Sequence, residues 1–524
     1  MRNKYILVIA ALVILFSTSC KKYLDVNKNP NAPQEVTANL YLGNILSQMS
    51  MSPQWDGRYL SKYSQMWAET TALNTYDRMG FISGSDANSE HWRTVYWLFG
   101  YNLINMMEQA EAEERWDILG VGYILKAWGW QQLTDLHSDI IITEAFNIER
   151  YKFKYDTQEF AYEEVQRLLL KAIEYLNRTD GKVSATYLAV GDPIYKGNRI
   201  KWKRFAYGLL AQSRSHLTNK TSLYKPDEII SYVDSAFVGN SDDALFPYTG
   251  TRAATTPFFA PGRNNFGTFR QTEFIVNLLD STVYGAPDPR LGRMLAWSRD
   301  STYQGLQPTY GYAGMELIKQ PMNLMQYTSN PEATDPGKYI FHNTASIPLL
   351  TYSQLQFIKA EAAYYKGSKD VALQAYVSGI ASHIEFVNKN TSEAGRAGVT
   401  TITNVERDEF LASEVVPADP DKLSLTHILG QKYIAQWGWA FVEAWTDLRR
   451  YHYTDLDPIT GDQVFSTFTP PAPDRLDVDN RGELTYRVRP RYNSEYIWNV
   501  EELERIGGLE RNYHTKIMWI FEKD

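Results

Sequence analysis

The sequence contains a single cysteine, Cys20, among its 524 residues. One thiol cannot form an intrachain disulfide, and it cannot supply the cysteine pairs of a structural zinc site. Three common enzyme patterns are also absent: the His-Glu-x-x-His pair, the Gly-x-Ser-x-Gly sequence and the glycine-rich phosphate-binding loop. The eight histidines are scattered without the spacing of metal ligands. These absences predict a protein without a metal site and without a cofactor.

A large excess of charge of one sign is also lacking. The chain has 53 basic and 61 acidic residues, a net charge of −8, and no basic stripe or basic motif. Nothing in this pattern favours a nucleic-acid partner. After the N-terminus, no apolar run approaches the ~20 residues that a membrane-spanning helix needs. The content of 44% hydrophobic and 22% charged residues is typical of a folded globular protein.

Aromatic residues, by contrast, are abundant. The chain has 14 Trp, 36 Tyr and 22 Phe, and many of them stand among Gly, Asn and other polar residues rather than in apolar runs. Aromatic side chains outside a core usually contact flat ligands or partner proteins. The alternative for any one of them is that it completes a helical core.

The N-terminus has the pattern of an export signal. A basic start is followed by the apolar stretch 6–16, which is too short to span a bilayer. Small residues at 17–19 then lead into Cys20, as in a bacterial lipoprotein, although Ser17 stands where Leu is usual. We predict a lipoprotein signal peptide over residues 1–19 and lipidation of Cys20, which would anchor the protein to a membrane. An uncleaved anchor and ordinary secretion are the alternatives.

The rest of the chain is predicted to be one domain after a short tether. The polar, proline-containing stretch after Cys20 predicts a tether, and no long linker appears beyond it. Long irregular segments in a compact protein are usually functional loops. The predicted parts are a lipidated tether at 20–35 and a single domain at 36–524, with a helical scaffold at about 36–238 and 352–450 and loop-rich inserts at about 240–345 and 455–524.

Apolar residues recur with helical spacing through much of this domain. The hairpin at 348–387 has two such stripes, separated by Gly367, a residue suited to the left-handed conformation that ends a helix. It resembles a degenerate tetratricopeptide unit, and the alternative is an ordinary antiparallel helix pair. The helices predicted in this way are about 36–50, 56–72, 89–113, 116–136, 157–177, 199–218, 271–284, 352–387 and 423–450.

Two groups of residues could carry chemistry. Glu443 and Asp447 lie four residues apart on one helical face, as the carboxylates of a glycoside hydrolase could. Arg449 and Arg450 stand beside them, however, and ion pairing lowers a carboxyl pKa, whereas a general acid needs a raised one. A structural ion-pair network of Glu443, Asp447, Arg449 and Arg450 is therefore favoured over catalysis.

The second group, 477–483, has the Asp and Asn spacing of a calcium loop. It lacks the flanking helices and the distal bidentate Glu of such a loop. A solvated turn is therefore favoured.

Five further segments are informative through their order along the chain. They are Cys20 to Asp25 with Asn29-Pro30-Asn31, Lys201 to Ala206, Asp288 to Leu291, Pro348 to Ile380, and Gln431 to Arg450. Taken together and in this order, they resemble the SusD/RagB family of outer-membrane lipoproteins of Bacteroidetes, in particular its SusD-like branch. Two departures from the family pattern are Asn198, where the family often has Asp, and the ending at 516–520, which follows the family only loosely.

The resemblance implies a binding protein rather than an enzyme. Its fold would be mostly α, with tetratricopeptide-like helix pairs forming a scaffold with a loop-rich ligand-binding face. The protein would lie at the cell surface, anchored in the outer membrane, as a lid on a SusC-like TonB-dependent transporter. It would capture oligosaccharides or, in some members, peptides for import.

Sugar capture needs flat apolar faces for the C–H side of pyranose rings and polar groups for the hydroxyls. Two loops offer such residues, and we expect ligand contacts there. For each residue, a place in the core or against the transporter is the alternative. The candidates are Asn74, Tyr76, Asp77, Arg78 and Phe81 in the first loop, and Trp297, Arg299, Tyr303, Gln304, Tyr310 and Tyr312 in the second.

Overall fold

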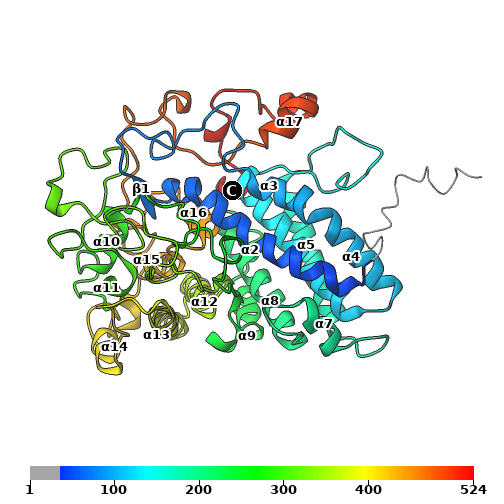
Figure 1. Ribbon diagram of the computed structural model, residues 1–524, viewed down its shortest axis with the longest axis horizontal. Coiled ribbons are helices and arrows are strands. Elements are labelled where there is room, and N and C mark those ends of the chain that lie inside the picture. The colour runs from blue at the N-terminus through cyan, green and yellow to red at the C-terminus, as the bar shows by residue number, and fades with distance from the viewer. Residues whose placement is uncertain (1–35) are drawn as a thin grey trace, which may run out of the picture.

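The computed structural model describes residues 36–524 (Figure 1). The predicted signal peptide, Cys20 and the tether lie outside the described residues. The first half of the described chain is helical and contains α2 (Ala38–Tyr63), α3 (Glu90–Arg93), α4 (Gly100–Ala112), α5 (Trp116–His137), α6 (Gln158–Asn177), α7 (Ala185–Gly191), α8 (Arg199–Ser215) and α9 (Pro226–Ser235).

The second half alternates helices with long loops. Its helices are α10 (Glu273–Leu279), α11 (Leu291–Met294), α12 (Tyr352–Lys366), α13 (Lys369–Ala394), α14 (Asn404–Leu411), α15 (Leu425–Gln436), α16 (Phe441–Arg450), α17 (Tyr492–Trp498) and α18 (Val500–Arg505). Four short strands form two antiparallel pairs, β1 (Trp67–Glu69) with β3 (Phe269–Gln271) and β2 (Ala244–Phe246) with β4 (Ile347–Leu350). In the first pair Trp67 lies opposite Gln271, and in the second Ala244 lies opposite Leu350. The fold is mostly helical, as predicted.

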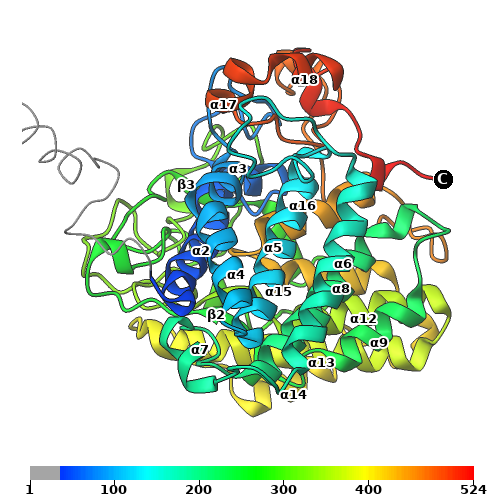
Figure 2. The same ribbon diagram turned by 90° about the vertical axis from the view of Figure 1, so that its right-hand side faces the viewer.

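The helices form one continuous stack. Helix α5 packs on α4 and α6, α6 on α8, α8 on α9, and α9 on α12, which in turn packs on α13 and α15 (Figure 2). Two large apolar clusters run through this stack, one centred on α5, α6 and α8, the other on α13, α15 and α16. Because each helix is covered on two sides, the stack gives a rigid support for the loops at its ends.

The hairpin of α12 and α13 follows the sequence prediction. Gly367 adopts φ +81°, and its N–H donates to carbonyls of the last turn of α12. Gly379 lies at the contact of the two helices, because a Cβ there would come within 2.7 Å of the Phe357 ring. Glycine is therefore required both at the turn and at the closest approach.

The segment predicted as a helix at 56–72 is different. Helix α2 runs without a break through Pro53 and ends at Tyr63, after which Gln65 adopts φ +56°. Residues 67–69 then form β1, whose partner β3 lies 200 residues away in the sequence. Helical spacing is a local signal and could not reveal that pairing. Short helices were also missed, namely α11, α17 and α18 in the predicted loop-rich inserts and α7, α9 and α14 between the predicted helices of the scaffold.

A buried network of charged side chains connects three helices at the centre of the stack. Lys432 of α15 lies 3.1 Å from Glu443 and 2.9 Å from Asp447, both on α16. Arg450, also on α16, contacts Asp447 at 2.8 Å and binds both carboxylate oxygens of Glu361 on α12. All five side chains are buried.

One part of the predicted network is wrong. Within residues 36–524, Arg449 makes no ion pair. Its guanidinium stacks on the Trp445 ring at 3.7 Å and donates to the carbonyl of Tyr486 at 2.8 Å. The reason is that Arg449 and Arg450, being adjacent, leave the helix in different directions, and only Arg450 faces α12.

A second buried arginine fixes the loop-rich segment to the helical hairpin. Arg290 pairs with Asp288 at 2.5 Å and reaches His383 of α13 at 2.9 Å and Gln431 of α15. The 288–291 motif is thus an anchor between loop and scaffold.

We predict that Arg450→Met lowers the free energy of unfolding by about 3–5 kcal/mol, because it leaves the buried carboxylate of Glu361 without its cationic partner. Arg167→Met is the matched control. Arg167 also binds both oxygens of a glutamate, Glu164, at 2.7 and 2.8 Å, but at the surface of α6, so the expected change is about 0–1 kcal/mol. Urea unfolding of both variants measures the difference. Equal losses in the two would contradict the role of burial.

Candidate functional site

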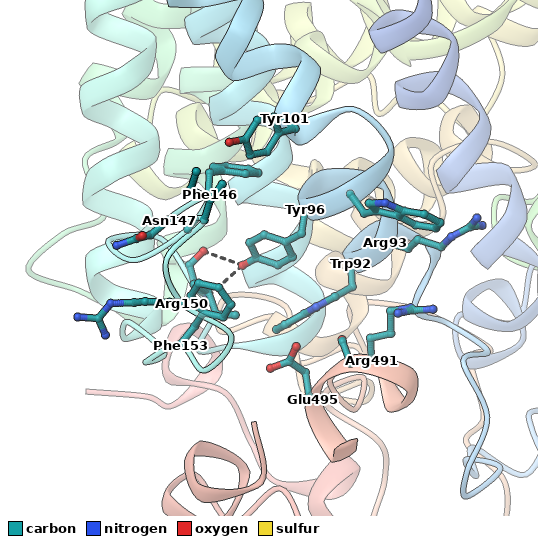
Figure 3. Close-up of a pocket in the computed structure, with 15 residues that line it drawn as sticks. Trp92, Arg93, Tyr96, Tyr101, Phe146, Asn147, Arg150, Phe153, Arg491 and Glu495 are labelled. Atoms are coloured by element: carbon teal, nitrogen blue, oxygen red, sulfur yellow. Dashed lines mark hydrogen bonds between the residues drawn. The ribbon is translucent and has the colours of Figure 1, made fainter. Parts of the chain in front are cut away.

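A cleft of about 420 Å³ lies where the segment from α3 to α4 meets the loop between α5 and α6 and the start of α17 (Figure 3). Its lining is rich in aromatic rings, with a few charged groups among them. The lining residues are Trp92, Arg93, Tyr96, Trp97, Tyr101, Ile141, Ala145, Phe146, Asn147, Ile148, Arg150, Phe153, Arg491, Ser494 and Glu495.

A turn of π-helix at Thr94–Leu98 sets the directions of the first group of rings. Such turns insert an extra residue into a helix and occur often at functional sites. Here Trp92 is buried against Tyr96, with ring centroids 5.0 Å apart, whereas Trp97 is 66% exposed at the edge of the cleft. The same short segment therefore supplies both the floor and an exposed flat surface.

The loop between α5 and α6 is fastened to this floor. The hydroxyl of Tyr96 donates to the carbonyl of Ile141 at 2.7 Å and accepts its N–H at 2.9 Å. Farther along, Phe146 adopts φ +64°, a strained conformation for a bulky residue. Its ring fits because Gly100 has no side chain, since a Cβ there would come within 2.5 Å of it. Strain of this kind persists where the surrounding packing holds it, so the cleft is preformed.

Three arginines border the cleft, and each has a carboxylate partner. The guanidinium of Arg93 lies 4.8 Å from the centre of the Trp97 ring and 3.3 Å from Glu90. The other two pairs are Arg150 with Glu144 at 2.8 Å and Arg491 with Asp86 at 2.7 Å. Each pair neutralises charge but leaves further N–H donors of the guanidinium for the oxygens of a ligand.

Glu495 is the only acid among the lining residues. It accepts hydrogen bonds from the Tyr155 hydroxyl at 2.5 Å and from Asn499 at 2.9 Å, and burial raises its pKa above the usual range. Hydrolysis of a glycosidic bond requires two carboxyl groups that flank the bond. The lining therefore offers flat aromatic faces, N–H donors and the single carboxyl group of Glu495.

Two residues of the first predicted loop are wrong as ligand contacts, because they are buried. Tyr76 and Asp77 are 4% and 1% exposed, so neither can contact a ligand. Tyr76 packs on Tyr59, at 4.5 Å between ring centroids, and Asp77 accepts the N–H of Glu69, while burial raises the pKa of Asp77 to about 7. Both residues hold the loop in place.

The other residues of that loop already have contacts within the protein or lie away from the aromatic cleft. The amide oxygen of Asn74 accepts the N–H of Tyr76, and Arg78 donates to the carbonyls of Arg475 and Leu476. Phe81 lines a different cavity, on the far side of α17 from the aromatic cleft.

The second predicted loop lies apart from the aromatic cleft. Gln304 and Tyr310 line a separate cavity of about 350 Å³ beside α10. Trp297 is half-buried over the amine of Lys338, and the hydroxyl of Tyr312 donates to the carbonyl of Pro321. Tyr303 is half-buried and Arg299 is exposed. The two loops do meet, because the N–H of Tyr312 donates to the carbonyl of Thr70 at 3.0 Å.

The sequence prediction missed the cleft itself. Its clearest signal was the density of aromatic residues in 92–101, which helical spacing assigned to an ordinary helix at 89–113. The remaining walls, 141–153 and 491–495, stand far apart in the sequence, so no local pattern joins them.

In the segment 477–483, which has the spacing of a calcium loop, the aspartate carboxylates already contact other groups of the protein. Asp477 accepts the N–H of Asp479 and pairs with Arg78, and Asp479 pairs with Arg511 at 2.7 Å. No cluster of three or more metal-ligating side chains occurs within residues 36–524.

The carboxylates that could have served a hydrolase belong to the buried network. Burial opposes ionisation of Glu443, but the charges of His216 and Lys432 outweigh it and lower its pKa. A general acid requires the opposite shift. His216 lies 2.9 Å from Glu443 and 3.4 Å from Asp135.

The buried His216 makes the stability of the fold depend on pH. Burial alone would lower its pKa, but Glu443 and Asp135 raise it to about 9. Protonated His216 therefore stabilises the fold fully below about pH 6.5, and this contribution, up to about 3 kcal/mol, is lost as the pH rises to about 9. We expect the difference in unfolding free energy between the parent and His216→Gln to shrink from pH 6 to pH 9. A constant difference would contradict this assignment.

Comparison with known proteins settles the family. The family model described as starch-binding and associating with the outer membrane, SusD-like, matches residues 30–471. The chain belongs to the SusD-like family. The resemblance seen in the sequence is thereby confirmed. No curated protein matches the chain in sequence.

Solved structures of SusD-like proteins share the fold. A SusD homologue from Bacteroides fragilis aligns with a TM-score of 0.71 at 20% identity, covering 93% of this chain and all of that one. A SusD/RagB family protein from Bacteroides thetaiotaomicron gives 0.70 at 20%, covering 94% of this chain and all of its own. A chitin-binding SusD homologue from Flavobacterium johnsoniae gives 0.66 at 19%, covering 92% and 98%. Within residues 36–524, no helix of this SusD-like chain is long and apolar enough to cross a bilayer.

Proposed function

We propose that this protein is a cell-surface, glycan-binding lipoprotein that delivers oligosaccharides to a SusC-like TonB-dependent transporter in the outer membrane. The observation that carries the proposal is the preformed aromatic cleft with exposed Trp97 at its edge. The description of the family as starch-binding and the chitin-binding relative support a carbohydrate ligand. Peptide capture by the same scaffold is the alternative, and the binding experiment below separates the two.

The chemistry of the cleft fits a sugar chain. The C–H faces of pyranose rings pack on the flat faces of Trp97 and Tyr101, and their hydroxyls accept hydrogen bonds from Arg93 and Arg150. Glu495 offers an acceptor at the inner end. Because the floor is already fastened, binding requires little reordering of the protein, which favours affinity.

We predict that Trp97→Ala weakens binding of the preferred oligosaccharide by about tenfold or more without changing the stability of the fold, because an exposed aromatic platform is removed. Titration calorimetry with glycans selected on an array that includes malto-oligosaccharides, chito-oligosaccharides and peptides measures the loss. Intact glycan after prolonged incubation is expected, and a released product would support the hydrolase alternative.

Trp55→Ala is the matched control for that variant. Trp55 is also exposed, at 39%, and also carries an arginine over its ring, Arg58 at 4.4 Å, but it lies on α2 outside the cleft. We expect it to bind like the parent. If Trp97→Ala and Trp55→Ala bound every array glycan with equal affinity, the cleft would not be the binding site. If the protein bound peptides and no glycan, peptide capture would replace the glycan proposal.

The anchor and the partner are tested in cells. We predict that Cys20→Ser abolishes acylation and, in cells that lack the transporter, moves the protein from the membrane fraction to the soluble fraction, because the lipid is then the one remaining membrane attachment in the proposal. Fractionation followed by immunoblotting measures this shift. In the parent, mild detergent extraction should co-purify a TonB-dependent transporter. Retention of Cys20→Ser in the membrane fraction would contradict the lipid anchor. Extraction of the parent without a transporter would contradict the proposed partner.

A further inference from the structure

A second cavity, of about 460 Å³, lies on the other side of α17 from the aromatic cleft. Phe81 is the one lining residue that belongs to the loops predicted to contact a ligand. Its lining residues are Phe81, Ser83, Gly84, Asp479, Arg489, Pro490, Tyr492, Tyr496, Leu509, Arg511 and His514.

One short helix separates the two cavities. Residues 491, 494 and 495 line the aromatic cleft, whereas Tyr492 and Tyr496 line the second cavity. An α-helix with its side chains is about 10 Å across, so a chain of a few sugar rings can reach from one cavity to the other. The loop that carries Ser83 is fixed to the same helix, because Asp86 accepts the N–H and the side-chain amide of Asn493.

The second cavity combines aromatic faces with polar groups, as the cleft does. The rings of Tyr492 and Tyr496 are stacked, with centroids 5.5 Å apart and planes at 26°, and Phe81 adds a third aromatic ring to the lining. Arg511 is exposed and pairs with Asp479 at 2.7 Å, so this pair carries no net charge. Arg489, the other arginine of the lining, already donates to the Tyr496 hydroxyl and to the carbonyls of Gly508, Glu510 and Arg511. A ligand with many hydroxyl groups fits this combination of flat faces and polar groups.

His514 adds an acceptor that lacks a donor. The side-chain N–H₂ of Asn480 donates to the carbonyls of Met79 and Glu483, so its oxygen faces Nε2 of His514, at 2.9 Å, as an acceptor. Nε2 must therefore carry the proton, and Nδ1 is a bare acceptor. Within residues 36–524, Nδ1 has no hydrogen-bond partner. Because a buried acceptor without a donor is unfavourable, a hydroxyl group of an occupant would stabilise this site once the His514 ring turned Nδ1 toward the cavity that it lines.

We propose that the second cavity is a further sugar-binding subsite, and that one oligosaccharide lies across α17 with rings in both cavities. This inference rests on the proposed glycan-binding function. The protein would then select extended chains, because a second contact on the same ligand is intramolecular and multiplies the affinity of the first.

The test uses a size series, from two to eight rings, of the array glycan that the full-length protein binds most tightly. We expect affinity for the parent to rise with length as the chain reaches the second cavity. Tyr492→Ala should weaken binding of the long members by roughly fivefold to tenfold and leave the short members unchanged. Tyr492 is exposed, so the substitution removes a wall of the cavity without opening the core.

Trp498→Ala is the matched control, because Trp498 is an exposed aromatic residue of the same helix that lines neither cavity. It should bind every member like the parent. Long chains that bind Tyr492→Ala and the parent equally, while Trp97→Ala weakens them, would overturn the second subsite and leave the glycan-binding function intact. Absence of binding by any array glycan to the parent would overturn both.

Discussion

The structure depends on one constraint, the need to pair every charge in the network of Glu361, Lys432, Glu443, Asp447 and Arg450. Removing such groups from water costs several kcal/mol each, and only close contact with an opposite charge offsets that cost. The contacts come from three helices, α12, α15 and α16, and His216 after α8 completes the group. A small shift of any one helix would leave a buried charge without its partner. The network therefore fixes the register of the scaffold more strictly than apolar packing alone could.

The end of α5 connects this buried network to both cavities. The hydroxyl of Tyr162 donates to Asp135, which also faces His216, so α5 joins the network. In the next two residues, the carbonyl of Leu136 accepts the N–H of Val488, and Nδ1 of the His137 ring lies 3.1 Å from the carbonyl of Val488. Val488 stands just before α17 in the chain, and the Trp92 ring of the cleft packs on His137 at 5.0 Å. The positions of α17 and of the cleft floor are thus both set by α5.

The sequence predicted the parts of the fold that have local causes. Gly367 ends α12 because only a residue that tolerates positive φ fits there, and the spacing of Asp447 and Arg450 is sufficient to indicate their ion pair on one helix. The partners of Glu443, His216 and Lys432, stand on other elements. The sequence did not reveal the features that depend on residues far apart in the chain. The strand at Trp67 depends on residues near 270, and the floor and walls of the cleft join residues near 92, 146 and 495. Tyr76 and Asp77 were chosen for their chemistry, but exposure is a tertiary property, and packing on Tyr59 buries the ring. The family resemblance supplied the overall architecture, and no local pattern located the cleft.

The charges around the cleft indicate how it would distinguish ligands. Each bordering arginine already faces a carboxylate, in the pairs Arg93–Glu90, Arg150–Glu144 and Arg491–Asp86. An anionic ligand would have to compete with these carboxylates for the same guanidinium groups, whereas a neutral sugar needs only the N–H donors that remain. Burial raises the pKa of Glu495, which favours its neutral form and lessens the cost of placing an apolar ring face beside it. On the proposed glycan-binding function, the cleft would therefore favour uncharged polyhydroxyl chains, recognised by flat contact and hydrogen bonds rather than by net charge. Since these groups lie outside the buried ion network, substitutions that alter ligand choice can leave the scaffold unchanged.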